Sequence, residues 1–437
     1  MALGHQFETL DPRTTSEWNC EFTNYRGNSA ELSAIISQMS IYESIYNNCM
    51  FGNIKLYDGT GLIENHGVIG SGLEKFHFEI LTENTAKEGA KTSNLEKIWN
   101  IDSVSKGHQN EKFTEYDIGI VSPYLHVNNK TKISRSFLKM TSSKIVEYVG
   151  AEILKFEGGA PNWASFDVTP TLHEKNTVVP NWNPFQLINF LAKNSVSADG
   201  SSNYLFFENN EGFKFTTVDD LMKKPVSRLF ALKNMPTKIA YAKGGLVVDD
   251  AMMTGVSEEA RFNIAKGQTS GQYGSSILTH NILEKRLDKY EVIYDGPKDK
   301  IMAETIGLNG PEAQQFADFN VWQHSGFMSD NYLYQIHDKG EKSHYPLYDQ
   351  KQSQLRTNVI KFDVPGDSNV FAGDVIQLRM PTHIHNHDLP EDQYVTGKWL
   401  ITAIHHKINN NSYEMTLECM KDGFFTDPDV TIPARTW

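Results

Sequence analysis

The chain has 437 residues, with 41 Lys and Arg against 54 Asp and Glu, and a formal net charge of −13. This acidic balance, without any block of Lys and Arg, argues against a surface built to grip nucleic-acid phosphates. The length favours about two to four domains. No apolar run approaches the roughly 20 residues that cross a bilayer, and the first residues lack the pattern of a secretory signal. We therefore expect a protein without a membrane anchor, made in a cytosol.

Cysteine usage points to a reducing compartment. Only Cys20, Cys49 and Cys419 occur, and no two of them form a CxxC pair. An odd and sparse set in a chain of this length favours free thiols over a disulfide framework.

The first third of the chain has the pattern of β-strands. Residues 1–30 are polar and rich in turn residues, and we expect them to form an N-terminal arm. In the strand predicted at 73–81, Phe76, Phe78 and Ile80 alternate with Lys75, His77 and Glu79, as in a sheet with one buried face. Further strands are predicted at 35–45, 53–57, 98–104 and 113–120, with a hairpin loop at 105–110.

In the middle of the chain, the spacing of apolar residues changes from that of strands to that of helices. Apolar residues recur at helical spacing in 142–154, with Ser142 or Ser143 as a candidate N-cap. A second amphipathic helix is predicted at 184–192, where Pro184 suits the first turn. The strands predicted at 204–208 and 212–215 form a hairpin around Asn209–Gly212. These features predict a small α+β domain.

The last quarter returns to strands, predicted at 358–364, 374–378, 398–408 and 413–419. The chain thus begins and nearly ends with a β-barrel-like unit, although no sequence identity between the two shows a duplication. The expected fold is mainly β with α+β insertions, made of two β-barrel-like tube domains and two smaller domains. The expected division is an arm at 1–30, a first tube domain at 31–141, an α+β domain at 142–225, a second tube domain at 226–250 and 346–425, an inserted smaller domain at 251–345, and a tail at 426–437.

Three histidines form the sharpest candidate for chemistry. His383, His385 and His387 alternate, so on a strand their imidazoles would share a face and suit zinc or iron. The alternative is a solvated loop between strands, which the surrounding Asp, Asn and Pro favour. No HExxH and no GxSxG motif occurs. We expect no enzymatic activity and no cofactor.

Aromatic residues allow two interpretations. Trp99, Trp182, Trp322 and Trp399 could form a sugar-binding platform, but aromatic residues in strands are more often core or subunit interface. Within Ile41–Asn48 we expect contact with a neighbouring chain, and the candidate interface residues are Tyr42, Glu43, Tyr46 and Asn47.

Several phrases of the sequence resemble the baseplate hub (tail hub) proteins of contractile-tailed phages, the T-even-type hub family. They are, with their residues, IYESIYNN (41–48), GNIKLYDGTGLIENHGVIG (52–70), KTKISRSFLKMTSSKIVEYVGAEIL (130–154), NWNPFQLINFLAKNSVSADGSSNYLFFENNEGFKFTTVDDLM (181–222), GQYGSSILTHNILEKRLDKY (271–290), RTNVIKFDVPGDSNVFAGDVIQLRMP (356–381) and GKWLITAIHHKINNNSYEMTLECMKDG (397–423). One departure is Asn281, where an acidic residue is more usual. The order and spacing of the phrases carry the resemblance.

The resemblance implies a structural protein of the virion tail. Such hubs form homotrimeric rings whose six tube domains imitate sixfold symmetry. One face meets the tail tube or tube-initiator proteins, and the other holds a trimeric central spike protein. The implied partners also include the tape-measure protein, with DNA present only in transit through the channel. The implied location is the tail baseplate, assembled in the host cytoplasm.

Two other functions remain open at this point. One is a host-binding, β-rich adhesin of the tail. The other is a metal-dependent hydrolase that uses the His383, His385 and His387 segment. Trimeric hubs of bacterial secretion machines share the implied architecture, and the lack of a fused spike with a β-helix pattern favours a phage-type hub.

Overall fold

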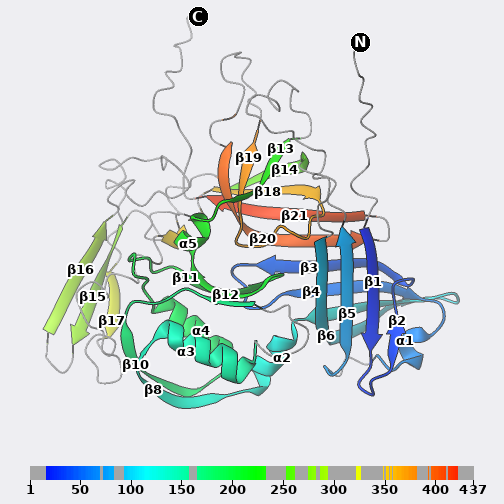
Figure 1. Ribbon diagram of the computed structural model, residues 1–437, viewed down its shortest axis with the longest axis horizontal. Helices are drawn as coiled ribbons and strands as arrows, with labels where there is room; N and C mark the ends of the chain where they lie inside the picture. Colours follow the sequence, from blue (N-terminus) through cyan, green and yellow to red (C-terminus); the bar gives the residue numbers. More distant parts are fainter. Residues whose placement is uncertain are drawn as a thin grey trace, which may run out of the picture.

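The structure is a computed structural model of the full chain, and it is mainly β (Figure 1). It describes residues 16–68, 72–82, 93–156, 165–232, 252–260, 274–281, 286–293, 321–325, 348, 351–353, 355–356, 358–380, 392, 395–409 and 412–421. The predicted fold class, mainly β with α+β insertions, is confirmed. Among the described residues, no helix combines the length and the apolar character that crossing a membrane requires.

The first β-unit is a curved sheet of seven strands with the order β2-β1-β5-β6-β7-β4-β3. The strands are β1 (Ser16–Thr23), β2 (Ser29–Glu31), β3 (Ile36–Ser44), β4 (Phe51–Asp58), β5 (Lys75–Thr82), β6 (Ser93–Gln109) and β7 (Thr114–Val121), with the short helix α1 (Leu62–Asn65) after β4. The predicted alternation in β5 is confirmed, because Phe76, Phe78 and Ile80 are at most 1% exposed.

Two expectations for this unit were wrong. Residues 105–110 are not a hairpin loop, because β6 continues to Gln109 and the turn follows at Asn110, whose Oδ1 accepts hydrogen bonds from the N–H groups of Lys112 and Phe113. Residues 16–30, the described part of the arm expected at 1–30, are not a separate arm either. The whole of β1 pairs with β5, and Cys20 and Phe22 are buried in the core. The prediction failed because most residues of this segment are polar, whereas the alternating side chains of Cys20 and Phe22 pack in the core.

The α+β unit, residues 123–222, lies below the β-units in Figure 1 and has a core of its own. Its elements are α2 (Pro123–Lys130), β8 (Ile133–Thr141), α3 (Ser142–Tyr148) continuing into a π-helical turn (Val149–Leu154), β9 (Ser165–Val168), β10 (Glu174–Trp182), α4 (Pro184–Lys193), β11 (Tyr204–Asn209), β12 (Gly212–Thr217) and α5 (Val218–Met222). Both predicted helices and the predicted hairpin are present. The N-cap of α3 is Thr141, one residue earlier than predicted, and its hydroxyl accepts a hydrogen bond from the N–H of Lys144.

The second β-unit is a closed barrel of six strands, in which β19-β13-β14-β18-β21-β20 are neighbours in that order and β20 returns to β19. The strands are β13 (Val226–Leu232), β14 (Met252–Ala260), β18 (Asn358–Pro365), β19 (Val375–Arg379), β20 (Gly397–Asn409) and β21 (Ser412–Lys421). β14 falls inside the range predicted for the inserted domain, yet it pairs with β13 and β18 of the barrel. The three strands β15 (Gly274–Asn281), β16 (Arg286–Ile293) and β17 (Val321–Ser325) form a separate sheet, at the left of Figure 1.

The two β-units have the same topology. The first has the antiparallel order β5-β6-β7-β4-β3 and the second has β19-β20-β21-β18-β14, so five strands correspond in chain order and in spatial order. The correspondence ends at the next strand, since β1 pairs with β5 antiparallel whereas β13 pairs with β19 parallel. The repeat that no sequence identity revealed is therefore present in the fold.

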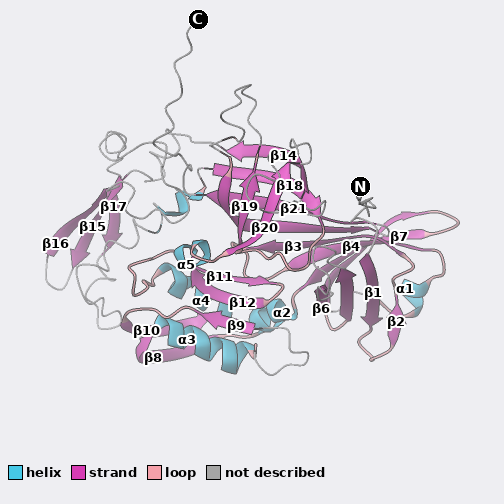
Figure 2. Cartoon of the chain, turned by 45° about the horizontal axis from the view of Figure 1, so that its top comes forward, coloured by secondary structure: helices cyan, strands magenta, loops and turns pink. Residues whose placement is uncertain are grey.

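The two units are joined edge to edge. β3 of the first pairs antiparallel with β20 of the second, so a continuous sheet runs through both, and one hydrophobic core extends beneath it (Figure 2).

Candidate functional site: the junctions between units

The junction between the β-units, here called the seam, is a ladder of seven residue pairs. It runs from Ala403 opposite Ser44 to Asn409 opposite Gln38. Because successive side chains of a strand point to opposite faces, each pair belongs either to the core side or to the outer face of the continuous sheet. The seam therefore fixes the position of one unit relative to the other by main-chain hydrogen bonds.

A buried polar cluster lies on the core side of the seam. The Glu43 carboxylate lies 3.4 Å from Nε2 of His406, and both side chains are at most 1% exposed. Glu43 Oε2 also accepts a hydrogen bond from the N–H of Ala372 (3.2 Å), and His406 Nδ1 lies 2.9 Å from the Tyr413 hydroxyl. Three chain segments, from both units, thus meet at the Glu43 carboxylate, and Tyr413 of β21 contacts the other side of the His406 ring. The buried N–H of Ala372 would lose its acceptor if the segments moved apart.

One of the candidate interface residues, Glu43, belongs to this buried cluster. Glu43 points into the core of its own chain, so it is not available to a neighbouring chain. Sequence reasoning missed it because a carboxylate in a strand normally marks the solvent face. The signal available was His406, a polar residue in the buried phase of β20.

The other candidate interface residues lie at or near the surface. Tyr42 is half-buried on the outer face, where its ring stacks between those of Phe51 (5.1 Å) and His405 (4.4 Å). Tyr46 is half-buried beneath the guanidinium of Arg356, 5.0 Å from the ring centroid. Asn47 is exposed. Whether these three contact another chain stays a prediction.

A second buried cluster joins the α+β unit to the first β-unit. Lys97 of β6 and Glu208 of β11 form an ion pair of 2.6 Å with side chains at most 1% exposed. The same carboxylate accepts hydrogen bonds from the N–H of Met50 (3.0 Å) and from the Ser122 hydroxyl (3.1 Å). Moving Glu208 away from Lys97 would leave a buried charge without its partner, which is costly. The ion pair therefore fixes the position at which the hairpin β11–β12 packs against the first β-unit.

Direct contacts also link the α+β unit to the second β-unit. Asn209 donates a hydrogen bond to the carbonyl of Ala372 (3.1 Å), just before β19. Lys351, which precedes β18, lies 2.7 Å from Asp219. All three units are therefore connected to one another within the described part of the chain.

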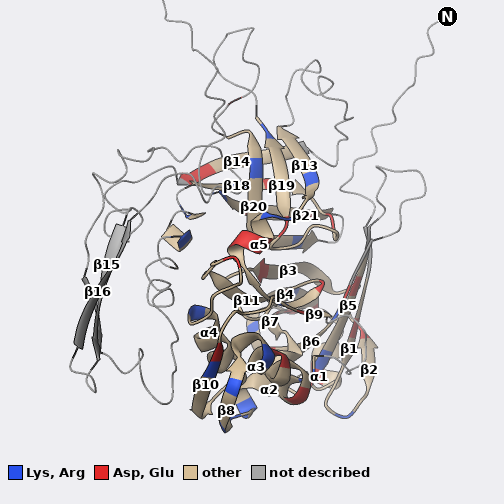
Figure 3. Ribbon diagram, turned by 60° about the vertical axis from the view of Figure 1, so that its left-hand side comes forward, with Lys and Arg blue, Asp and Glu red and all other residues tan. Residues whose placement is uncertain are grey.

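Burial shifts the pKa of two thiols and one imidazole in the described part of the chain. Burial raises the pKa of the Cys49 and Cys419 thiols well above the usual value, which makes them poor nucleophiles. Burial lowers the pKa of His405, and the nearby Lys407 and His406 side chains lower it further. Acidic and basic residues are interspersed along the ribbon in Figure 3.

No group of three or more metal-ligating side chains occurs among the described residues. The candidate metal ligands His383, His385 and His387 lie outside the described residues. The metal interpretation of that segment stays untested.

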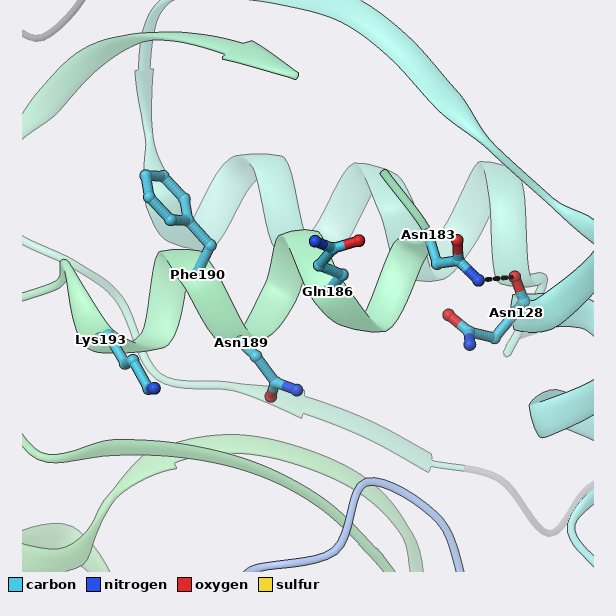
Figure 4. A pocket seen from close by; sticks show the side chains of 6 residues that line it. All are labelled: Asn128, Asn183, Gln186, Asn189, Phe190 and Lys193. Atoms are coloured by element: carbon cyan, nitrogen blue, oxygen red, sulfur yellow. Dashed lines mark hydrogen bonds between the residues drawn. The ribbon is translucent and has the colours of Figure 1, made fainter. Parts of the chain in front are cut away.

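A groove beside α4 has a volume of about 630 Å³ (Figure 4). Its lining side chains are Asn128, Asn183, Gln186, Asn189, Phe190 and Lys193. The Asn128 carbonyl accepts a hydrogen bond from the Asn183 amide (3.2 Å), and Asn189 donates one to Asn48 (3.3 Å). The groove offers side-chain amides, one aromatic ring and one ammonium, and its lining contains no carboxylate, imidazole or thiol.

Comparison with known proteins agrees with a structural assembly protein. No protein-family model matches the chain. A protein named "Probable baseplate hub protein gp334", of Vibrio phage KVP40, is 20% identical over 415 residues, which is 90% of this chain and 91% of that protein. The chain is thus similar, over most of its length, to a phage baseplate hub protein.

Solved structures agree on the fold. The tail protein from Neisseria meningitidis has a TM-score of 0.54 with 8% identity, covering 93% of this chain and 98% of that one. The 43 kDa tail protein of prophage MuSo2 from Shewanella oneidensis has a TM-score of 0.55 with 8% identity, covering 93% and 100%. These structures show the fold. The likeness to the Vibrio phage protein confirms the predicted resemblance to baseplate hubs and supports a structural role in the baseplate of a virion tail.

Proposed function

We propose that three copies of this chain form the central hub ring of a contractile phage tail, between a sixfold tail tube and a threefold spike. The observation that carries the proposal is the repeated topology of the two β-units within one chain. A ring of three such chains presents six similar β-units. Because a trimer can contact a hexamer equivalently only through two similar surfaces on each protomer, the repeat supplies what symmetry matching needs.

The proposed mechanism is mechanical and geometric. The buried clusters at Glu43 and at Glu208 support it, since they connect the units of a protomer through desolvated charges and hydrogen bonds. Such a protomer holds its two docking surfaces in a constant relation. The ring would hold the spike before the tail fires and leave a continuous channel for DNA after the spike is released.

The proposed partners follow from this position in the tail. They are two further copies of the chain, a trimeric central spike protein, tail tube or tube-initiator proteins, and the tape-measure protein. DNA would be present only in transit, in keeping with the net charge of −13. The role needs no cofactor and no catalytic residue.

The first test is the mass of the purified chain in solution. Light scattering over a range of concentrations is expected to give a trimer, and negative-stain electron microscopy is expected to show rings with six similar lobes. Co-expression with the spike protein of the same phage is expected to yield a complex of equal numbers of both chains. A strict monomer at every concentration, with and without the spike, would contradict the proposal.

A further inference from the structure

The groove beside α4 lies along the outer face of an amphipathic helix (Figure 4). Four of its six lining residues are three or four positions apart on α4: Gln186, Asn189, Phe190 and Lys193. Residues with this spacing share one face of a helix. The buried residues of α4 lie on its other side, against the core of the α+β unit. The groove is therefore on the side of α4 that is turned away from the core.

Two side-chain amides of the groove are held in place by the protein. The Asn183 amide donates a hydrogen bond to the carbonyl of Asn128 (3.2 Å), and its oxygen accepts one from the ammonium of Lys132. The Asn189 amide donates to Asn48, in the loop between β3 and β4 (3.3 Å). An amide group has two donor hydrogens and two acceptor lone pairs. Each of these amides therefore keeps hydrogen-bonding capacity for a ligand.

The groove also has two polar side chains without a partner in the described part of the chain. Gln186 and Lys193 are exposed, and neither makes a hydrogen bond or an ion pair there. Such residues on a helix are usually solvated, but here they stand beside two amides in fixed positions, around a hollow of about 630 Å³. Small-ligand sites have volumes of about 300–1,000 Å³.

An aromatic pair lies at the side of the groove. Phe190 is half-buried and contacts Trp182, with 5.0 Å between the ring centroids and an angle of 61° between the rings. Trp182 is one of the four tryptophans considered for a sugar-binding platform, whereas Trp99 and Trp399 are buried and cannot serve in one. Trp182 thus supports the ring that lines the groove. An aromatic ring supplies a rigid apolar surface, which packs well against the C–H face of a sugar ring.

The groove is positively charged in an acidic protein. Lys193 lines one end, Lys132 holds Asn183 at the other, and none of the lining side chains is a carboxylate. The chain as a whole has a formal net charge of −13. A ligand with an acidic group is therefore attracted to this groove, whereas the net charge of the protein repels it elsewhere.

We propose that the groove beside α4 binds a saccharide chain that carries an acidic group. A side-chain amide is a donor and an acceptor at once, as neighbouring sugar hydroxyls are, so Asn183, Gln186 and Asn189 match such a ligand. Phe190 packs against a sugar ring, and Lys193 pairs with the acidic group. From Asn183 to Lys193 the helix is about 15 Å long, which suits a short chain of sugars.

The same surface is a poor match for a protein partner. Binding energy at protein interfaces is concentrated in large aromatic or arginine side chains that fill pockets, and the lining offers one half-buried phenylalanine. The inference goes beyond the proposed ring and does not depend on it, because every residue that carries it belongs to one protomer.

Isothermal titration calorimetry of the full-length chain tests the inference. The probes are sialyllactose with lactose and trigalacturonic acid with galactotriose, two pairs that each have an acidic and a neutral member. At least one acidic probe is expected to bind about tenfold more tightly than its neutral counterpart, as one charge-assisted hydrogen bond gives. Added salt is expected to reduce this preference. No binding by either acidic probe, or equal binding within both pairs, would overturn the inference.

Two single variants locate the site, since both residues are exposed. Lys193→Ala is expected to lower the affinity for the acidic probe about tenfold and to leave the affinity for the neutral probe unchanged. Gln186→Ala is expected to weaken the binding of both. The matched control is Gln109→Ala, which removes an exposed side-chain amide from β6 and is expected to change nothing. Circular dichroism checks that each variant folds.

The outcomes separate this inference from the proposed function. A chain that forms trimers but binds no acidic probe would overturn the inference and leave the ring standing. Binding by a chain that never forms trimers would support the inference and contradict the ring. Binding that both variants leave unchanged would place the site elsewhere and overturn the inference. Capture of the spike protein that Gln186→Ala, Lys193→Ala abolishes, without saccharide binding, would make the groove a protein interface and also overturn it.

Discussion

Trp99 and Trp399 occupy the same place in the two β-units, each two residues before the irregularity that divides its strand. Both indoles are buried, and each lies under a lysine ammonium: Lys97 is 5.4 Å from the Trp99 ring and Lys421 is 4.5 Å from the Trp399 ring. The two sites differ at the indole N–H. That of Trp399 donates to the carbonyl of Val395 (2.7 Å), whereas that of Trp99 has no acceptor among the described residues.

This difference predicts unequal costs for the same substitution. Trp399→Phe and Trp99→Phe each remove buried indole volume and weaken a cation–π contact. Only Trp399→Phe also loses a hydrogen bond, so it is expected to cost about 1 kcal/mol more in the free energy of unfolding. Urea unfolding followed by circular dichroism measures both. Equal costs would show that the Val395 contact contributes nothing.

Lys97→Met is expected to destabilise the chain by about 3–5 kcal/mol, because it leaves the Glu208 carboxylate buried without its cation. Lys97→Met, Glu208→Gln is expected to recover most of this, since the neutral amide still offers an oxygen to the N–H of Met50. Lys223→Met, which breaks an exposed ion pair with Asp199, is the control and is expected to leave unfolding unchanged. A double variant as unstable as Lys97→Met would contradict the account.

Glu43→Ala is expected to lower the free energy of unfolding by about 1–3 kcal/mol for each buried polar group that it leaves without a partner. The group left without a partner is the N–H of Ala372, while the His406 ring keeps its contact with the Tyr413 hydroxyl and loses the carboxylate 3.4 Å from its Nε2. Glu43→Gln keeps an acceptor for the Ala372 N–H and is expected to cost less. Chemical denaturation of the three proteins ranks them, and a Gln variant less stable than the Ala variant would contradict the proposed contacts.

His405 predicts a pH dependence at the seam. Burial lowers its pKa below the ordinary value of 6.5, helped by Lys407 and His406 and opposed by Asp363. The native state then binds fewer protons at this site than the unfolded chain does. Its contribution to stability is complete above about pH 6.5 and is lost as the pH falls through the lowered pKa.

His405→Phe preserves an aromatic ring to stack on Tyr42 and removes this titration. The free energy of unfolding of the variant is expected to fall less between pH 7 and pH 5 than that of the unaltered chain. Thermal or urea unfolding at several pH values gives the comparison. Identical pH profiles would show that His405 does not titrate differently in the folded and unfolded states.

Strand and helix positions followed from local patterns. The alternation in β5, the period of α4 and the turn residues of the β11–β12 hairpin each have a short-range physical cause, so the sequence alone determined them. The phrases near both ends also indicated the hub family. The local pattern gave a wrong prediction for β1, because the burial of Cys20 and Phe22 stabilises a strand in a segment of mostly polar composition.

The junctions could not be predicted in this way. Glu43 reads as a solvent-facing residue until β20 brings His406 beside it, and Lys97 has no visible partner until β11 brings Glu208, 111 residues later in the chain. The correspondence of the two β-units lies in their strand order. Main-chain hydrogen bonds hold that order whatever the side chains are, so it leaves no trace in the sequence. The sequence by itself determined the elements, the acidic character and the family resemblance. Only the tertiary structure decided the seam and its buried charges, because these depend on which distant strands become neighbours.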